Sequence, residues 1–341
     1  MKYCIYLKKG EPEVNFLSEE HIFPAGIGGI RKLPIEYVSH DCNNKFSIME
    51  QTFMRESVIA IPRQFYGPGK RGNLNPKNAT KSEVSVITDN ENDVQLGYIS
   101  LGKPYKIMQM KWNKNGSCRF STNPRLGDAH LQLETFLINM KNFTGKFKKR
   151  KTPLLDENQI ILGLHNNMWY VAYNDEKIIS ELAVFISKVL EQKPFETQEF
   201  QYQQNQISVH STTVVDDSYY RVCAKIIFNY LAFIKGQEFV LNNCFDKLRE
   251  WIVKGGEQNL VQIVDKGIVE ELEFPDQSHS LFITKVQNNL VGYISFYGNA
   301  FKNLILLSDE FFESFWVEGF ICDWKNREEY DFLQYLNEIR E

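Results

Sequence analysis

The sequence predicts an α+β protein in which antiparallel hairpins and amphipathic helices follow one another along 341 residues. Apolar and polar residues alternate in short runs between 84 and 112 and between 160 and 173, which is typical of half-buried strands. Helical spacing of apolar residues recurs in 46–58, 178–190 and 217–235. Because no run of about 18 or more apolar residues occurs, we expect no membrane-spanning helix.

The N-terminal region predicts short elements around one helix. Residues 2–7 are typical of a strand, 26–29 of a flexible turn, and 46–58 of a helix with one apolar stripe. Prolines and glycines between 62 and 72 interrupt this pattern. We therefore place the first domain boundary after residue 72.

Strands, turns and helices alternate in the remainder of the chain. Hairpin turns are expected at 90–93, at 113–116 and at Asn166-Asn167, where polar residues separate apolar runs. Asp217 or Ser218 can cap a helix that ends before Gly236. The other expected elements are a helix over 238–254, a meander of strands over 281–307 and a terminal helix from residue 326.

Charge is distributed unevenly along the chain. The 39 basic and 43 acidic residues give a formal net charge of -4, which at first argues against a dedicated nucleic-acid-binding protein. Residues 1–100 are balanced, whereas 101–151 have 12 basic and two acidic side chains, and 152–341 have 15 basic and 29 acidic ones. Such asymmetry is typical of a partner-binding surface, although the basic run 146–151 also fits a solvated linker.

Six cysteines are scattered along the chain, at positions 4, 42, 118, 223, 244 and 322. They form no dense framework of the secreted kind, so we expect reduced thiols that pack as small apolar side chains. The N-terminus lacks the small-residue cleavage site of a signal peptide. These features predict a cytoplasmic protein without a membrane partner.

Glu20, His21 and Asn43 together have the chemistry of a phosphodiester hydrolase. A carboxylate and a side-chain amide supply hard oxygen ligands of the kind that Mg²⁺ or Mn²⁺ prefers. An imidazole with an ordinary pKa of about 6.5 can accept a proton from water at neutral pH. For Asn43 and its neighbour Asn44, a role in capping the following helix is the alternative.

Three stretches of the N-terminal region have a recognisable order and spacing, namely Glu20-His21-Ile22-Phe23-Pro24, Gly28-Gly29 and Cys42-Asn43-Asn44-Lys45-Phe46. Over residues 1–65 the chain resembles the bacterial HNH endonucleases with the pattern Glu-His-x-x-Pro, Gly-Gly and Cys-Asn-Asn-x-Phe. The resemblance implies a ββα-metal site, in which two strands and a helix surround one divalent ion, Mg²⁺ or Mn²⁺. It implies that His21 is the general base and that Glu20 and Asn43 are metal ligands. The residues that the resemblance places in supporting positions are Asn44, Glu50 and Arg63.

One departure from the family pattern concerns zinc. Relatives often hold a structural zinc between two Cys-x-x-Cys pairs, whereas Leu7 and Ser39 here stand where each pair has its other cysteine. A four-thiolate site needs all four ligands, so we expect no structural zinc. A remnant site made of Cys4, Cys42 and His40 stays open as an alternative.

A second departure concerns the middle Asn of the family pattern, which relatives use to orient the histidine. Around that position the chain has Pro34-Ile35-Glu36. We therefore expect Glu36 or a backbone carbonyl to orient His21. The remaining histidines without partner spacing are expected to be structural, and these are His130, His165, His210 and His279.

The expected organisation has three parts. A nuclease domain spans 1–72, a basic strand-rich segment that faces nucleic acid spans 73–155, and an acidic mixed α/β module spans 156–341, with a role in regulation, oligomerisation or binding of a protein partner. Phosphate contacts are expected from Lys103, Lys106, Lys111, Lys146, Lys148, Lys149, Arg150 and Lys151, on a sheet that faces either a duplex or a core.

Two hypotheses for function follow. The first is a metal-dependent endonuclease that cuts double-stranded DNA, in a setting of bacterial restriction or anti-phage defence that the resemblance permits. The second is a catalytically degenerate HNH fold that binds nucleic acid or a protein partner.

Overall fold

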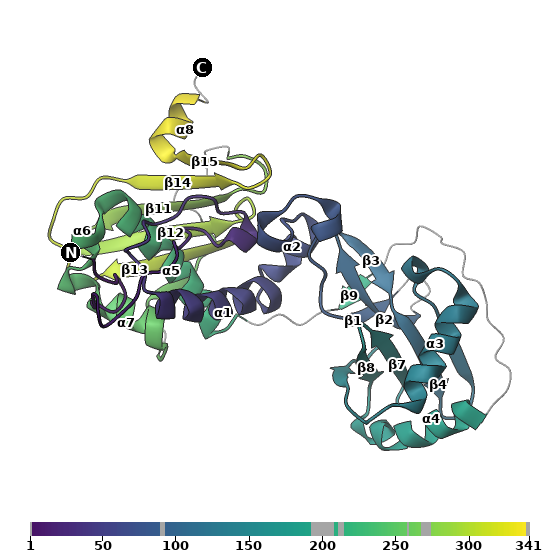
Figure 1. Ribbon diagram of the computed structural model, residues 1–341. Helices are drawn as coiled ribbons and strands as arrows, with labels where there is room; N and C mark the ends of the chain where they lie inside the picture. The colour runs from purple at the N-terminus through teal and green to yellow at the C-terminus, as the bar shows by residue number, and fades with distance from the viewer. Residues whose placement is uncertain are drawn as a thin grey trace. The chain divides into compact units, whose positions relative to one another are not determined.

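The computed structural model describes residues 2–88, 93–191, 208–210, 215–257, 259–266 and 274–338. The chain forms two compact units (Figure 1). Met1–Thr80 and Thr213–Glu341 together make the outer unit, and Lys81–Thr212 makes the inserted unit. Both units combine helices with antiparallel strands, which confirms the expected mixed α+β class.

The outer unit is built on a six-stranded antiparallel sheet with the order β10-β13-β12-β11-β14-β15. Its strands are β10 (Val261–Ile263), β11 (His279–Val286), β12 (Asn289–Phe296), β13 (Phe301–Ser308), β14 (Glu318–Asp323) and β15 (Glu328–Asp331). β11, β12 and β13 form the meander that the sequence predicts over 281–307.

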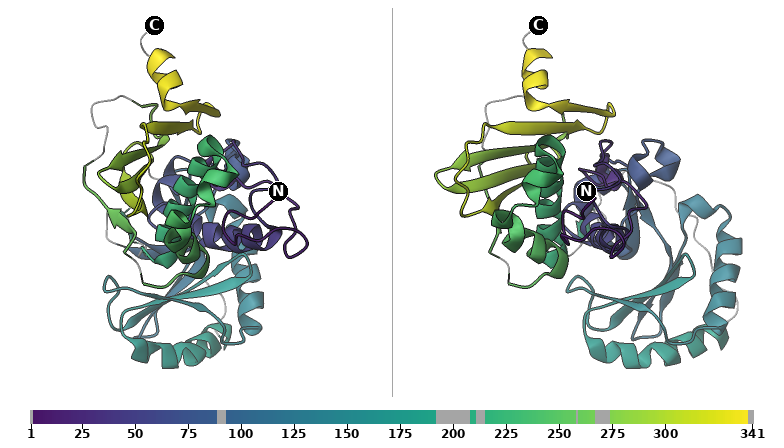
Figure 2. Two further views of the ribbon diagram at one scale, coloured as in Figure 1. Left: turned by 90° about the vertical axis from the view of Figure 1, so that its left-hand side faces the viewer. Right: turned by 60° about the vertical axis from the view of Figure 1, so that its left-hand side comes forward.

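Helices cover this sheet in layers (Figure 2). α5 (Asp217–Lys235) and α7 (Asp246–Lys254) pack on the strands, and α1 (His40–Glu56) packs against α5. A helix enclosed in this way has to be apolar around its circumference, and every residue of 222–232 is buried. Only Lys225 and Asn229 are polar within that stretch, and they lie one helical turn apart.

The N-terminal and C-terminal parts of the outer unit share one hydrophobic core. Phe23 and Phe46 belong to the same buried cluster as Phe228 and Phe320. The N-terminal part also contains the 3-10 turns η1 (Ala25–Ile27), η2 (Lys70–Gly72) and η3 (Pro76–Asn78), and the short helix α2 (Ala60–Phe65). The first 72 residues are therefore not a separate domain, because their core is completed by α5 and the sheet.

The inserted unit stacks two sheets and a layer of helices. One sheet has the order β3-β2-β1-β9 and the other β5-β4-β7-β8-β6. One apolar cluster joins the two sheets, and another joins the five-stranded sheet to α3 (Ala129–Lys141) and α4 (Leu182–Glu191). The strands are β1 (Ser85–Thr88), β2 (Val94–Ser100), β3 (Lys103–Lys106), β4 (Met108–Asn113), β5 (Cys118–Ser121), β6 (Lys148–Lys151), β7 (Gln159–His165), β8 (Met168–Tyr173) and β9 (Ser208–His210).

The hairpin predictions hold in this unit. β7 and β8 pair across Asn166-Asn167, both of which have positive φ, and strands occur between 84 and 112 as predicted. The run 105–112, predicted as one strand, is divided between β3 and β4, which belong to different sheets. The turn predicted at 90–93 lies outside the described residues except for Asp93. The helix predicted over 178–190 begins as η5 (Glu176–Glu181) and continues as α4.

The boundary predicted after residue 155 differs from the observed division. β4 pairs with β7 along its whole length, so the five-stranded sheet contains residues from both sides of that boundary. The basic run 146–151 is not a linker, because Lys148–Lys151 form β6, an edge strand parallel to β8.

Four local predictions differ from the structure. The strand predicted over 2–7 is a tight turn, in which Lys8 has φ 53° and its N–H donates to the Cys4 carbonyl at 2.8 Å. The helix predicted over 238–254 breaks into α6 (Gln237–Val240), η6 (Asn243–Phe245) and α7, because Asn242 caps η6. The tail forms β15 before its helix α8 (Phe332–Glu338) begins, and α5 is capped by Asp216.

All six cysteines are free. Cys4, Cys42, Cys223 and Cys322 are buried among apolar side chains, as expected of reduced thiols. Within the described ranges, no helix has the length and apolar character needed to cross a bilayer.

Candidate active site

His21 lies in a short antiparallel pair of extended segments. The N–H of Ile22 donates to the carbonyl of Arg31 at 3.0 Å, and His21 and Lys32 form a bridge between the two segments. α1 begins a few residues later, at His40. The chain order around His21 is therefore extended segment, extended segment and helix.

The turn between the two segments is fixed to the sheet of the outer unit. Gly28 has φ 104°, and a Cβ there would lie 2.2 Å from Cβ of Trp324, so only glycine fits. The buried ring of His279 accepts the N–H of Tyr297 at Nδ1, and its Nε2 donates to the carbonyl of Ile27 at 3.1 Å. Burial lowers the pKa of His279 to about 3, so this ring is neutral and structural, as the sequence predicts.

Lys225 of α5 joins two carboxylates near His21. Its Nζ donates to Oε1 of Glu20 in a short contact and to Oε1 of Glu50 on α1 at 2.6 Å. The Lys225 side chain is 0% exposed and the Glu20 side chain 6%. Lys225 therefore neutralises acidic groups that come from two different segments, 205 and 175 residues away in sequence.

Electrostatics favours the charged form of Lys225. Burial alone lowers the pKa of Lys225, but the charges of Glu20 and Glu50 and their hydrogen bonds outweigh burial and raise it. Burial raises the pKa of Glu20, Lys225 counteracts that shift, and Glu50 adds to it. A buried charge is tolerated only when it is paired, and here one ammonium serves both acids.

Asn229, one helical turn after Lys225, holds the backbone of His21. Its Nδ2 donates to the His21 carbonyl at 2.9 Å, and its Oδ1 accepts the hydroxyl of Tyr6 at 2.6 Å. Asn229 is 0% exposed, so these bonds satisfy a buried amide. Lys225 and Asn229, the lysine and the asparagine of the buried stretch 222–232, thus both support the segment 20–21.

The His21 imidazole lies at the partly exposed side of the cluster. Burial lowers its pKa, and the nearby ammonium of Lys32 lowers it further, while Glu50 opposes the shift. The neutral form is therefore favoured at pH 7, which is the form that can accept a proton.

Asn43 lies on the first turn of α1 and faces the segment before His21. Its Nδ2 donates to Oγ of Ser18 at 3.0 Å and to the carbonyl of Glu19 at 3.4 Å. The cap of α1 is Ser39, whose Oγ accepts the N–H of Cys42, so the alternative capping role for Asn43 does not apply. Contacts through Glu19 and Lys225 link Asn43 and Glu50 of α1 to the segment of Glu20 and His21.

Two predicted supporting residues lie elsewhere. The Glu36 side chain forms an ion pair with Lys2 at 3.0 Å and is 44% exposed, so it does not orient the His21 ring. Asn44 contacts the ring of His40 at 3.0 Å on the exposed side of α1. Among the described contacts, it is Asn229 that fixes the backbone of His21.

Cys4 and Cys42 face each other in the core, with their Sγ atoms 4.0 Å apart. The hydrogen bond between the two thiols lowers the pKa of Cys4 to about 5, and the N–H of Ser39, which donates to Sγ of Cys4, contributes to the shift. In the part of the chain that the structure describes, no group of three or more His, Cys, Asp or Glu side chains could hold a metal. The remnant site that would include His40 is therefore not seen, and Cys4 with Cys42 packs as a pair.

The basic residues predicted to contact phosphates belong to the inserted unit, and several are neutralised there. Lys111 pairs with Asp93 at 3.1 Å, Lys148 and Arg150 pair with Glu83 at 3.0 and 3.3 Å, and Lys149 pairs with Glu176. Ion pairing lowers the charge available to a polyanion. Lys103, Lys146 and Lys151 are exposed, and Lys106 is half-buried on β3.

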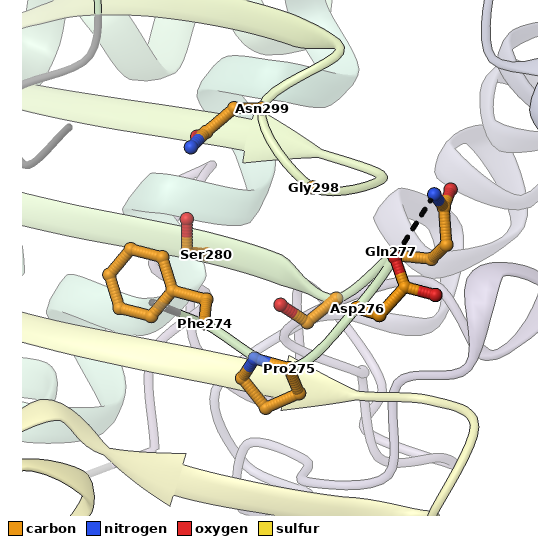
Figure 3. A pocket seen from close by; sticks show the side chains of 8 residues that line it. Phe274, Pro275, Asp276, Gln277, Ser280, Gly298 and Asn299 are labelled. Carbon is orange, nitrogen blue, oxygen red and sulfur yellow. Dashed lines mark hydrogen bonds between the residues drawn. The ribbon is translucent and has the colours of Figure 1, made fainter. Parts of the chain in front are cut away.

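A separate pocket lies at the start of β11 in the outer unit (Figure 3). Phe274, Pro275, Ser280 and Asn299 are among its lining residues. Its acidic residue, Asp276, forms an ion pair with Lys325 at 2.6 Å. None of the residues predicted to act in hydrolysis lines this pocket.

Sequence reasoning missed Lys225 and Asn229. The signal that could have found them is local, because a lysine and an asparagine four residues apart interrupt an otherwise apolar helix. Their partners, Glu20 and the His21 carbonyl, lie about 200 positions away in sequence and give no local signal.

Comparison with family models, with curated proteins and with solved structures finds no match to this chain. The functional argument therefore depends on the geometry of the cluster.

Proposed function

We propose that this protein is a divalent-metal-dependent endonuclease that hydrolyses DNA phosphodiester bonds, with His21 as the general base of an HNH-type ββα site. The observation that carries the proposal is the arrangement around His21. Its extended segment pairs with a second one, and α1 follows. Asn43 of α1 donates to the carbonyl of Glu19, and Glu50 of α1 shares the ammonium of Lys225 with Glu20. This is the chain order that the resemblance of residues 1–65 implies.

A carboxylate and an amide oxygen are donor types that Mg²⁺ or Mn²⁺ prefers. Such ions take hard oxygen ligands and often keep only one or two from the protein. Glu20 would supply a carboxylate and Asn43 its amide oxygen Oδ1, while Nδ2 of Asn43 donates to the carbonyl of Glu19 at 3.4 Å. A bound divalent ion would supply charge stabilisation of the phosphate.

The protein's own residues would do the following. The neutral His21 ring would accept a proton from the attacking water, which requires its partly exposed position. Asn229 would hold the backbone of His21 in place through its hydrogen bond to the His21 carbonyl. Lys225 would hold Glu20 and Glu50 together, so that neither carboxylate turns away from the site.

A second candidate is a degenerate nuclease fold that binds nucleic acid or a protein without cutting it. One observation favours it. Glu20, the predicted metal ligand, is 6% exposed and already shares the ammonium of Lys225. A divalent ion beside Glu20 would have to coexist with that positive charge.

Cleavage of supercoiled plasmid DNA with Mg²⁺ or Mn²⁺ separates the two candidates. We expect nicking or cutting by the wild-type protein, none in the presence of EDTA, and a loss of about 10²- to 10⁴-fold in rate for His21→Ala, because that change removes the general base. His130→Ala, on the exposed side of α3, is the matched control and should cut normally. Cleavage by His21→Ala at the wild-type rate would refute the assignment of the base, and binding without cleavage under either ion would favour the second candidate.

A further inference from the structure

The outer unit contains a segment without acidic residues. No Asp or Glu occurs between Glu56 and Glu83, while residues 57–80 include four basic side chains, Arg63, Lys70, Arg71 and Lys77. Arg55 lies immediately before Glu56, at the end of α1. The local charge is therefore positive in a chain whose sum is negative.

Four of these basic residues are exposed, and we call Arg55, Lys70, Arg71 and Lys77 the basic surface. Among all described residues, no carboxylate forms an ion pair with any of the four. This distinguishes them from Lys111, Lys148, Lys149 and Arg150 of the inserted unit, whose charges are shared with acids. Unpaired exposed cations are the groups that a phosphate backbone can neutralise with release of counterions.

Buried Arg63 fixes this segment through hydrogen bonds to backbone carbonyls. It is 5% exposed, and its Nε donates to the carbonyl of Gly26 at 2.8 Å while Nη2 donates to that of Gly69 at 3.2 Å. No carboxylate in the described ranges pairs with it either. A buried guanidinium that is bonded only to neutral carbonyls adds to the positive potential above it.

The segment is held in a strained conformation. Arg71, inside η2, has φ 53°, a left-handed value that is unfavourable for a residue with a Cβ. Such strain persists only where the surroundings enforce it, and it concentrates at ligand-binding positions. Here the neighbouring residue Gly72 packs closely against the segment after His21, because a Cβ on Gly72 would lie 2.8 Å from the carbonyl oxygen of Ala25.

This packing places η2 next to the segment that follows His21. η1 and η2 are in contact, and Ala25 comes four residues after His21. Four residues span at most about 14 Å between Cα atoms. A duplex strand has a phosphate for every 3.4 Å or so of its axis, so one duplex can reach both places.

We propose that the basic surface binds the phosphate backbone of a DNA duplex and holds the strand beside His21. The inference rests on the proposed function for the identity of the polyanion. It moves the DNA contacts from the strip predicted at 101–151 to the outer unit, where the catalytic residues lie. The contacts are to phosphates, so they carry no sequence preference.

The test is duplex binding by the full-length protein, measured by fluorescence anisotropy with a labelled duplex of about 30 base pairs as a function of salt. The variant is Lys70→Ser/Arg71→Asn/Lys77→Ser, because asparagine tolerates the left-handed conformation at position 71. Loss of three phosphate contacts should lower the slope of log K against log salt by about 2.7 and raise Kd by about two orders of magnitude at 0.1 M salt.

Two further triple variants make the result specific. Lys247→Ser/Lys254→Ser/Lys325→Ser removes the same charge from lysines that are each paired with an exposed acid, and it should bind like the wild type. Lys103→Ser/Lys146→Ser/Lys151→Ser tests the exposed lysines of the basic segment that the sequence predicts to contact phosphates. A loss for this last variant as large as for the basic-surface variant, an equal loss for the paired-lysine control, or no duplex binding by the wild type would each overturn the inference.

Cleavage is scored separately from binding. Should the wild type bind DNA through the basic surface but not cut it, the proposed nuclease activity fails and the binding inference stands. Should it cut DNA while the basic-surface variant binds normally, the binding inference fails alone. Circular dichroism of each variant checks that the fold is retained.

Discussion

Replacement of Lys225 by methionine is expected to destabilise the outer unit strongly. The methionine side chain is similar in length to that of lysine and is apolar, so it fills the space without the charge. Glu20, whose side chain is 6% exposed, then loses its cationic partner, and Glu50 loses a bond of 2.6 Å. Removal of one partner of a buried ion pair costs about 3–5 kcal/mol, because the remaining charge stays desolvated.

Urea unfolding monitored by circular dichroism measures the effect. With an m-value of about 2–3 kcal/mol/M, a loss of this size lowers the unfolding midpoint by about 1–2.5 M. Lys235→Met is the matched control on the same helix. Its ion pair with Glu318 has side chains that are 30% and 32% exposed, so its loss should cost less than about 1 kcal/mol.

A compensating variant tests the reason for the loss. Glu20→Gln in the Lys225→Met background removes the uncompensated charge and should recover more than half of the lost stability. The electrostatic reasoning is refuted should Lys225→Met shift the midpoint no more than Lys235→Met does. It is also refuted should the double variant be less stable than Lys225→Met alone, since then the carboxylate is not the source of the cost.

Two further predictions concern the turn between the His21 segments. The pKa of His279 is about 3 in the folded state and about 6.5 in the unfolded state, so the unfolded state binds the proton first as the pH falls. The contribution of His279 to the free energy of unfolding is therefore constant above pH 6.5. It decreases by about 2 kcal/mol at pH 5 and continues to decrease toward pH 3. His279→Gln should lack this component, and a pH profile of urea midpoints identical to that of the wild type would contradict the assignment. Gly28→Ala should lower the thermal unfolding midpoint by several degrees, because the new Cβ would lie 2.2 Å from Cβ of Trp324. Gly236→Ala is the control: Gly236 has φ 87° and nothing within 4 Å of an added Cβ, so this variant reports the cost of backbone strain alone. Equal shifts for the two glycine variants would show that the close approach to Trp324 is unimportant.

Local patterns in the sequence predict most of the secondary structure. The hairpin at Asn166-Asn167, the meander of β11 to β13 and the helix α5 each follow from alternation, turn residues or a cap within a few positions. The failures are also local in origin. Lys8 adopts a left-handed conformation that no pattern of apolar residues reveals, and Asn242 caps a turn inside a stretch that has helical spacing.

The division into units was not predictable in the same way. The boundary placed after residue 155 followed composition, and composition does not report that β4 pairs with β7. The charge of segment 101–151 is real, but a sum over residues cannot show that Lys111 lies 3.1 Å from Asp93 or that two of the cations share Glu83. Exposed and unpaired charge depends on the folded contacts, which is why the shorter segment at 55–77 is the better candidate for binding a polyanion.

The candidate site was predictable only on its N-terminal side. Glu20, His21 and Asn43 lie within 24 residues and share a recognisable spacing, whereas Lys225 contacts Glu20 across 205 positions. This contact has a consequence for the acidic C-terminal region, which the sequence suggests is an accessory module. Because α5 supplies both the cation that pairs with Glu20 and the amide that holds the His21 backbone, the region completes the site itself. Any activity at His21 therefore requires α5 to be folded against α1, and a change that loosens this helix pair would act on the site without touching a single residue of the first 65.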